Sequence, residues 1–484
     1  MKNIKRIISS VLILGACLSP LTVPVMVQQP SWAQSPNAQT QEFQRLIEQA
    51  TQQGQQGKHK QAIETWQQVI VISQKIKIRK LEVLALIGIG FNYNSISQPQ
   101  EALKYLNQAL PIALEVGDRS GEATTLSNIG AVYNRISQPQ EALKYYNQAL
   151  PIRREVGDRY GEATTLSNIG GVYNSQPQEA LKYYNQALQI MRKVGNRAGE
   201  AATLNNIGAV YDSISQPQEA LKYYNQALPI MWQVGDRYGE ATTLSNIGGV
   251  YNRISQPQEA LKYYNQALPI RREVDDRSGE AATLNSIGAV YDRISQPQEA
   301  LKYYNQALPI MRKVGNRAGE AATLNNIGAV YDSISQPQEA LKYYNQALPI
   351  MWQVGDRYGE ATTLSNIGGV YNRISQPQEA LKYYNQALPI RREVDDRSGE
   401  AATLNSIGAV YDRISQPQEA LKYYNQALPI RREVGDRSGE AATLNSIGAV
   451  YDRISQPQEA LKYYNQALPI RREVGDRSGE AATL

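Results

Sequence analysis

A segment of about 40 residues is repeated with few changes from Gln98 to the C-terminus. Successive copies are 40 residues apart except for one interval of 38, and residues 190–310 recur unchanged at 310–430. A unit this short buries its apolar face only against its neighbours, so the repeat predicts a solenoid with one elongated core. The copies open with prolines at Pro99, Pro139, Pro177, Pro217, Pro257, Pro297, Pro337, Pro377, Pro417 and Pro457.

Composition excludes several classes of protein. The 484 residues contain one cysteine, Cys17, and one histidine, His59, so the repeats cannot form a disulfide framework, a Cys/His metal cluster or a Ser-His or Cys-His dyad. Acidic and basic residues balance within each repeat, and the net charge is only +5, which does not resemble a nucleic-acid-binding surface. We therefore predict a non-catalytic protein without metal or cofactor that does not bind nucleic acid.

The first 33 residues have the pattern of an export signal. Lys2, Lys5 and Arg6 precede an apolar run over 7–18, and Ser31-Trp32-Ala33 offers small residues at a cleavage site. We predict a signal peptide over 1–33, a linker over 34–40, and a periplasmic or extracellular protein.

A second interpretation of this segment remains open. Leu14-Gly15-Ala16-Cys17 resembles a bacterial lipobox, which would place a lipid anchor on Cys17. The apolar run is shorter than the roughly 20 residues of a transmembrane helix, so no membrane span is predicted.

Apolar periodicity predicts two helices in each repeat. In the copy over 121–156, one stripe contains Ala123, Leu126, Ile129, Gly130 and Tyr133, and a second contains Ala142, Leu143, Tyr146, Ala149 and Leu150. Ser137-Gln138-Pro139-Gln140 has the form of a capping box, which predicts that the Ser137 side chain caps the second helix. Gly157 and Asp158 are expected to end that helix and to cap the next one.

These spacings resemble the tetratricopeptide repeat, with Leu126 for its tryptophan and Tyr146 for its phenylalanine. The 40-residue period and the Gly-Asp-Arg between helices are similar to Pins-type arrays and, more loosely, to kinesin light chain. The resemblance implies an all-α, right-handed superhelical solenoid of antiparallel helix pairs with about 11 repeats. It also implies that first helices line a concave face that binds peptides.

The repeats are not all alike. Residues 41–80 fit a divergent N-terminal capping repeat, 81–478 form the array, and 479–484 are expected to be the truncated start of a further repeat. The copy over 161–198 lacks two residues, which predicts a local irregularity. Pro151 lies inside a second helix and is expected to bend it.

Candidate partner-binding residues lie on the first helices outside the packing stripe. Amides offer both a donor and an acceptor to a peptide backbone, and the resemblance implies this role for Asn128, Asn168, Asn206, Asn246, Asn326 and Asn366. Guanidinium groups could bind carboxylates of a partner, and the candidates are Arg135, Arg253, Arg293, Arg373, Arg413 and Arg453.

The sequence thus predicts a scaffold that binds protein or peptide partners along the concave face. Two alternatives remain open. The chain could be the recognition arm of a longer enzyme, since similar exported bacterial arrays precede a caspase-like CHAT domain. It could also be a self-associating surface protein in which repeat number sets length.

Overall fold

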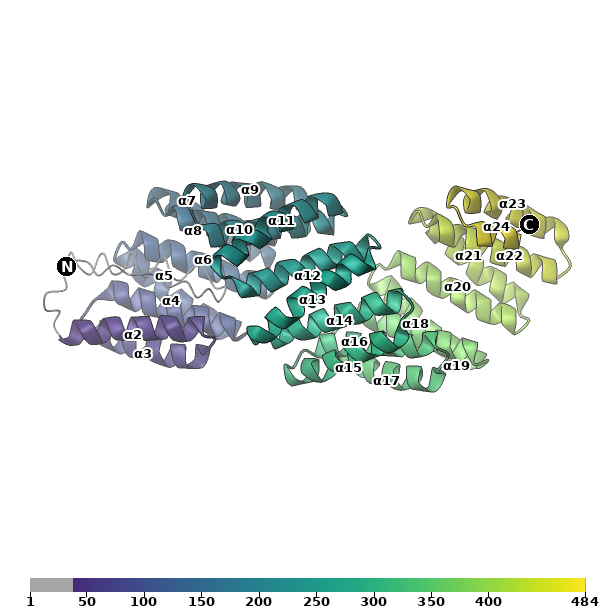
Figure 1. The fold of residues 1–484 in the computed structure, drawn as a ribbon, viewed down its shortest axis with the longest axis horizontal. Helices are drawn as coiled ribbons and strands as arrows, with labels where there is room; N and C mark the ends of the chain where they lie inside the picture. Colours follow the sequence, from purple (N-terminus) through teal and green to yellow (C-terminus); the bar gives the residue numbers. More distant parts are fainter. Residues whose placement is uncertain (1–37, 484) are drawn as a thin grey trace. The chain divides into compact units, whose positions relative to one another are not determined.

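The computed structural model describes residues 38–483, which form 23 α-helices and contain no strand (Figure 1). Each helix of even number begins a repeat and is called an A helix, and the following helix of odd number is its B helix. Along the sequence, the chain divides after Asp276 into two compact units. The prediction of an all-α solenoid of helix pairs is confirmed.

The first unit contains twelve helices, each joined to the next by a short turn. They are α2 (Ala38–Gln55), α3 (His59–Lys75), α4 (Arg79–Ser95), α5 (Pro99–Glu115), α6 (Arg119–Arg135), α7 (Pro139–Glu155), α8 (Arg159–Val172), α9 (Pro177–Lys193), α10 (Arg197–Ser213), α11 (Pro217–Val234), α12 (Arg237–Arg253) and α13 (Pro257–Glu273).

The second unit repeats this arrangement from Arg277 onward. Its helices are α14 (Arg277–Arg293), α15 (Pro297–Lys313), α16 (Arg317–Ser333), α17 (Pro337–Val354), α18 (Arg357–Arg373), α19 (Pro377–Glu393), α20 (Arg397–Arg413), α21 (Pro417–Glu433), α22 (Arg437–Arg453), α23 (Pro457–Glu473) and α24 (Arg477–Thr483).

The turn that follows α7 has the predicted chemistry. Gly157 adopts a φ of 72°, a left-handed conformation that glycine tolerates without strain. The next residue, Asp158, accepts a hydrogen bond from the Gly161 backbone N–H and so caps the following A helix. The prediction for Gly157 and Asp158 is confirmed.

The capping box predicted at Ser137-Gln138-Pro139-Gln140, in the turn between α6 and α7, is wrong. The residue that precedes helix α7 is Gln138, and no side chain caps this helix. Ser137 instead adopts a φ of 57°, in the left-handed region, and its backbone N–H donates to the Asn134 carbonyl at 3.1 Å. Ser137 therefore supplies the left-handed residue that ends its helix, as Gly157 does after α7. Its side chain is not the cap.

Glycine and tyrosine are matched where A and B helices cross. A Cβ placed on Gly130 of α6 would lie 2.8 Å from the ring of Tyr146 on α7, so only glycine allows this approach. Tyr146 is 1% exposed, and burial raises the pKa of its phenol. The adjacent Tyr145 stacks on Tyr133 with ring centroids 5.4 Å apart.

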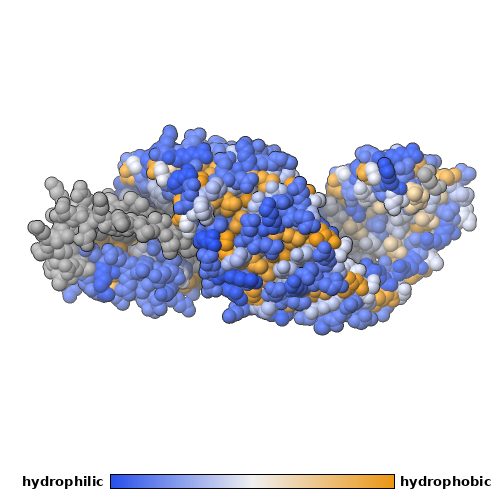
Figure 2. Space-filling view, in the orientation of Figure 1, coloured by the Kyte–Doolittle hydropathy of each residue, from blue (hydrophilic) through white to orange (hydrophobic). Residues whose placement is uncertain are grey.

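Each stretch of core joins one B helix to the next repeat. The cluster around α8 contains side chains from α7, α8 and α9, namely Ala142, Tyr146, Leu150, Ala163, Leu166, Ile169, Ala187, Ile190 and Met191. Within a unit, successive A helices contact each other directly, whereas successive B helices are farther apart. The A helices therefore form the inner, concave layer, and grooves open between B helices. Figure 2 shows a mostly hydrophilic surface with hydrophobic residues exposed in places.

The irregular repeat has a shortened A helix, and the N-terminal region begins with a helix inside the predicted linker. Helix α8 has 14 residues where most A helices have 17, because the two missing residues end it at Val172, so the predicted irregularity is confirmed. Helix α2 begins at Ala38, three residues before the predicted start of the capping repeat at residue 41. The signal peptide, the rest of the linker and Cys17 lie outside the described residues.

Residues 38–483 lack two other kinds of feature. Within that range, no helix is long and apolar enough to cross a membrane. In the same range, no group of three or more His, Cys, Asp or Glu side chains is placed to hold a metal ion.

Candidate partner-binding surface

The six predicted asparagines all lie half-buried on A helices, where the resemblance placed them. Three have intramolecular partners. Asn128 Nδ2 donates to the carbonyl of its own helix four residues earlier at 2.9 Å. Asn246 and Asn366 each donate at 3.2 Å across to the preceding A helix, where Asn205 and Asn325 accept.

The other three asparagines keep their amides available. In the part of the chain that the structure describes, Asn168, Asn206 and Asn326 make no side-chain hydrogen bond. A half-buried amide without a partner is costly unless water or a ligand supplies one. These three positions are therefore better candidates for ligand contact than Asn246 or Asn366.

A pocket of about 140 Å³ lies between α6 and α8 and brings two predicted residues together. Asn128 and Asn168 both line it, surrounded by hydroxyl groups and small side chains. Its remaining lining residues are Phe91, Thr124, Ser127, Ala131, Arg153, Gly161, Thr164 and Thr165. The pocket therefore offers amide and hydroxyl groups of the kind that bind an extended backbone.

Arg153 is the functional candidate that the sequence analysis missed. It belongs to a B helix and is 4% exposed, and its guanidinium pairs with Asp158. Burial lowers the pKa of Arg153. Its Nε is buried without a hydrogen-bond partner, so the guanidinium beside this pocket keeps one unsatisfied donor.

The residue that makes room for Arg153 is a glycine. A Cβ on Gly161 would lie 2.7 Å from Arg153 Nε. The glycine two residues after each Asp-Arg pair was thus a usable signal, because it marks a place where another side chain crosses the helix. A buried arginine Nε without a hydrogen-bond partner recurs at Arg271, Arg391, Arg431 and Arg471.

The six predicted arginines are exposed at the ends of A helices, and most are engaged within the chain. Arg253, Arg373 and Arg453 form ion pairs with an aspartate 41 residues earlier, on the preceding A helix. Arg135 donates to Ser97 Oγ at 2.9 Å, and Arg413 donates to a backbone carbonyl.

These contacts join neighbouring repeats at the edge of the A layer. Exposed ion pairs stabilise a fold weakly, by about 0.2–1 kcal/mol, so a partner carboxylate could exchange with the aspartates. The structure therefore brings these arginines to the predicted surface but does not leave most of them free.

Comparison with known proteins agrees with the helix pairs. The sequence model described as "Tetratricopeptide repeat" matches residues 81–155, 121–176, 161–231, 239–313, 295–351, 359–433 and 419–473. Together these matches cover most of the chain. The chain therefore belongs to the tetratricopeptide repeat family. No curated protein matches it by sequence.

Several solved structures share the fold at low identity. A signal transduction ATPase with a tetratricopeptide repeat sensor from Pyrococcus horikoshii is 14% identical, with a TM-score of 0.58, over 75% of this chain and 55% of that one. The apo quorum sensor NprR from B. thuringiensis is 17% identical, with a TM-score of 0.51, over 68% and 97%.

A Rap protein complexed with Competence and Sporulation Factor is 14% identical, with a TM-score of 0.51, over 74% and 99%. This chain thus spans about half the length of the ATPase. At such identities the similarity shows the fold alone.

Proposed function

We propose that this protein is a non-catalytic scaffold that binds an extended peptide segment of a partner along its A-helix face. The observation that carries the proposal is the pocket between α6 and α8, which is lined by the guanidinium-bearing Arg153 and by Asn168, whose amide has no partner. A backbone carbonyl or a carboxylate of the peptide would accept from the Asn168 amide, and the positive charge of Arg153 would favour it.

Repetition supports binding over a long surface. Half-buried asparagines recur on other A helices, and each contact with a peptide would add a small increment on a preformed surface. Export, with cleavage after residue 33 or lipidation at Cys17, is proposed from the N-terminal sequence.

The test uses substitutions that the chain itself makes at equivalent positions. Met191 and Met231 occupy the place of Arg153, and Ser286 and Ser406 occupy the place of Asn168. Arg153→Met and Asn168→Ser should therefore preserve the fold, which circular dichroism checks.

Peptides that bind the protein would be selected from a phage-displayed library, and their affinity for each variant would be measured by fluorescence anisotropy. We expect at least one class of peptide to bind the double variant 10-fold or more weakly, with Lys182→Ala on a B helix as the control. If every selected peptide binds the double variant and the protein equally well, the pocket is not the binding site.

A further inference from the structure

A glutamate in the first turn of the A helices is held between two arginines. In the copy around α8, Arg154 Nε donates to Glu162 Oε1 at 2.9 Å, and Arg159 donates to Glu162 Oε2 at 2.5 Å. The bond from the B-helix arginine recurs at 2.6–2.8 Å in five further repeats, to Glu200, Glu320, Glu400, Glu440 and Glu480.

Tryptophan replaces that B-helix arginine in two repeats, at Trp232 and Trp352. Both indole rings lie in solvent, with exposures of 71% and 70%. An exposed tryptophan at a position that carries an ion-pairing arginine in most other repeats gains nothing from burial, so packing does not explain it.

The substitution leaves a carboxylate with one cationic neighbour fewer. Glu240 still accepts from Arg237 at 2.5 Å, but Arg237 also pairs with Glu273 at 2.6 Å, so two carboxylates share one guanidinium. The side chain of Glu240 is 13% exposed, compared with 5% for Glu162. A half-buried carboxylate with a deficit of positive charge favours a cation from outside.

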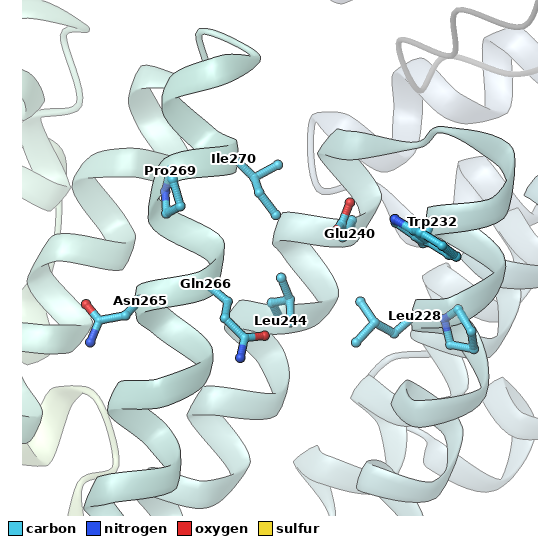
Figure 3. A pocket seen from close by; sticks show the side chains of 9 residues that line it. Leu228, Trp232, Glu240, Leu244, Asn265, Gln266, Pro269 and Ile270 are labelled. Atoms are coloured by element: carbon cyan, nitrogen blue, oxygen red, sulfur yellow. The ribbon is translucent and has the colours of Figure 1, made fainter.

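This carboxylate opens into a groove between B helices. A pocket of about 650 Å³ is lined by residues of α11, α12 and α13. Figure 3 shows Trp232 beside Glu240, with Asn265 and Gln266 on the helix across the groove. The apolar lining comprises Leu228, Pro229, Leu244, Pro269 and Ile270. The pocket therefore combines an aromatic face, a carboxylate, two amides and an apolar floor.

We propose that this groove binds an arginine side chain presented by a protein partner. The guanidinium would stack on the Trp232 ring and donate to Glu240, replacing the arginine that the chain supplies in other repeats. Asn265 and Gln266 offer carbonyl oxygens for its remaining N–H groups, and the apolar lining takes the aliphatic stem.

Guanidinium is favoured over ammonium because the in-chain precedent is the Nε of an arginine and because a planar cation stacks best on an indole. The proposal concerns the grooves between B helices and is independent of the A-helix surface.

The second unit carries the same residues. Arg357 donates to Glu360 at 2.5 Å and pairs with Glu393 at 2.6 Å, while Trp352 stands at the arginine position. The Glu360 side chain is 12% exposed. The chain would therefore have two equivalent arginine sites.

The experiment uses the peptide acetyl-Gly-Arg-Gly-amide as probe. Matched peptides carry citrulline, which keeps the shape without the charge, or lysine. Binding to the whole protein is followed by NMR of the tryptophan indole N–H signals. We expect the arginine peptide to shift the signals of Trp232 and Trp352 and to bind at least 10-fold more tightly than the citrulline peptide. Equal binding of these two peptides, or no binding of the arginine peptide, would overturn the proposal, and equal binding of lysine would overturn its assignment to a guanidinium.

Two double variants test the site without threatening the fold. The first variant carries Trp232→Leu and Trp352→Leu. Leucine is tolerated at this position, since Leu114 occupies it in another repeat, and the change should weaken binding at least 10-fold. Trp232→Arg with Trp352→Arg restores the in-chain ion pair and should block the site. Here binding is read from backbone amide shifts in α12 and α18. Retention of full binding by either variant, with helical circular dichroism unchanged, would refute the proposal.

Discussion

Two adjacent glycines on α12 should respond differently to the same substitution. A Cβ on Gly248 would lie 2.9 Å from ring atoms of Tyr264, which is 4% exposed, whereas a Cβ on Gly249 would lie 3.7 Å from the Tyr264 hydroxyl, an ordinary contact. Either change to alanine gains about 1 kcal/mol of helix propensity. Gly248→Ala also overpacks the helix crossing, at a cost of about 1–3 kcal/mol.

We therefore expect Gly249→Ala to raise the free energy of unfolding by up to about 1 kcal/mol and Gly248→Ala to leave it unchanged or lower it by up to about 2 kcal/mol. The array itself carries alanine at the position of Gly249, as Ala131, Ala209 and Ala289, but keeps glycine at the position of Gly248.

Urea unfolding followed by circular dichroism measures the total effect. Amide hydrogen exchange in α12 and α13 locates it, since a long array need not unfold in one step. In a Tyr264→Ala background the penalty of Gly248→Ala should disappear. Equal stabilisation by both single changes would show that the ring gives way freely and that close packing does not select this glycine.

Three further predictions concern the turns, the buried phenols and the duplicated block. Asp395 adopts a φ of 55° where Gly435 adopts 69°, so Asp395→Gly should stabilise the fold by roughly 0.5–1 kcal/mol and Gly435→Asp should destabilise it, as measured by thermal unfolding. Burial raises the pKa of Tyr184 and Tyr424 from 10.0 to about 12. The stability that the neutral phenols contribute is therefore complete below pH 10 and is lost between pH 10 and 12. In a pH titration, tyrosinate absorbance should rise together with loss of helix. Deletion of 311–430 joins Ile310 to Arg431 and recreates the sequence of α21 between copies of α20 and α22. Helical circular dichroism per residue should therefore be unchanged. A collapse of the helical signal would contradict nearest-neighbour packing.

The helices and their core faces could be predicted because the repeat shows them many times. Ala123, Leu126 and Ile129 recur at helical spacing in every copy, and they are buried in the structure. The turn at Ser137 could not be predicted from its pattern. The spacing of a capping box specifies which residues are present, but the backbone angle decides which of them caps, and Ser137 occupies the left-handed position.

The candidate site was predicted in position but not in its contacts. The asparagines lie on the A helices as expected, yet the bond from Asn246 to Asn205 crosses 41 residues, and such a pairing depends on how repeats stack. Arg153 was missed for the same reason. The two residues that follow it, Arg154 and Glu155, are charged, which is typical of a solvent-exposed face, and only the packing of α7 against Gly161 of α8 buries it.

The duplicated block shows how local these determinants are. Residues 190–310 and 310–430 are identical, and α12 in one unit and α18 in the other make the same bonds to the preceding repeat, from Thr243 and Thr363 at 3.0 Å. Equal sequences thus produce equal contacts at different places in the chain, which is the behaviour of nearest-neighbour packing. A site that needs only one repeat and its neighbours, such as the Trp232 groove, is therefore copied intact with its block. A surface that depends on many successive repeats is lengthened by the same event, so duplication multiplies the first kind of site and extends the second.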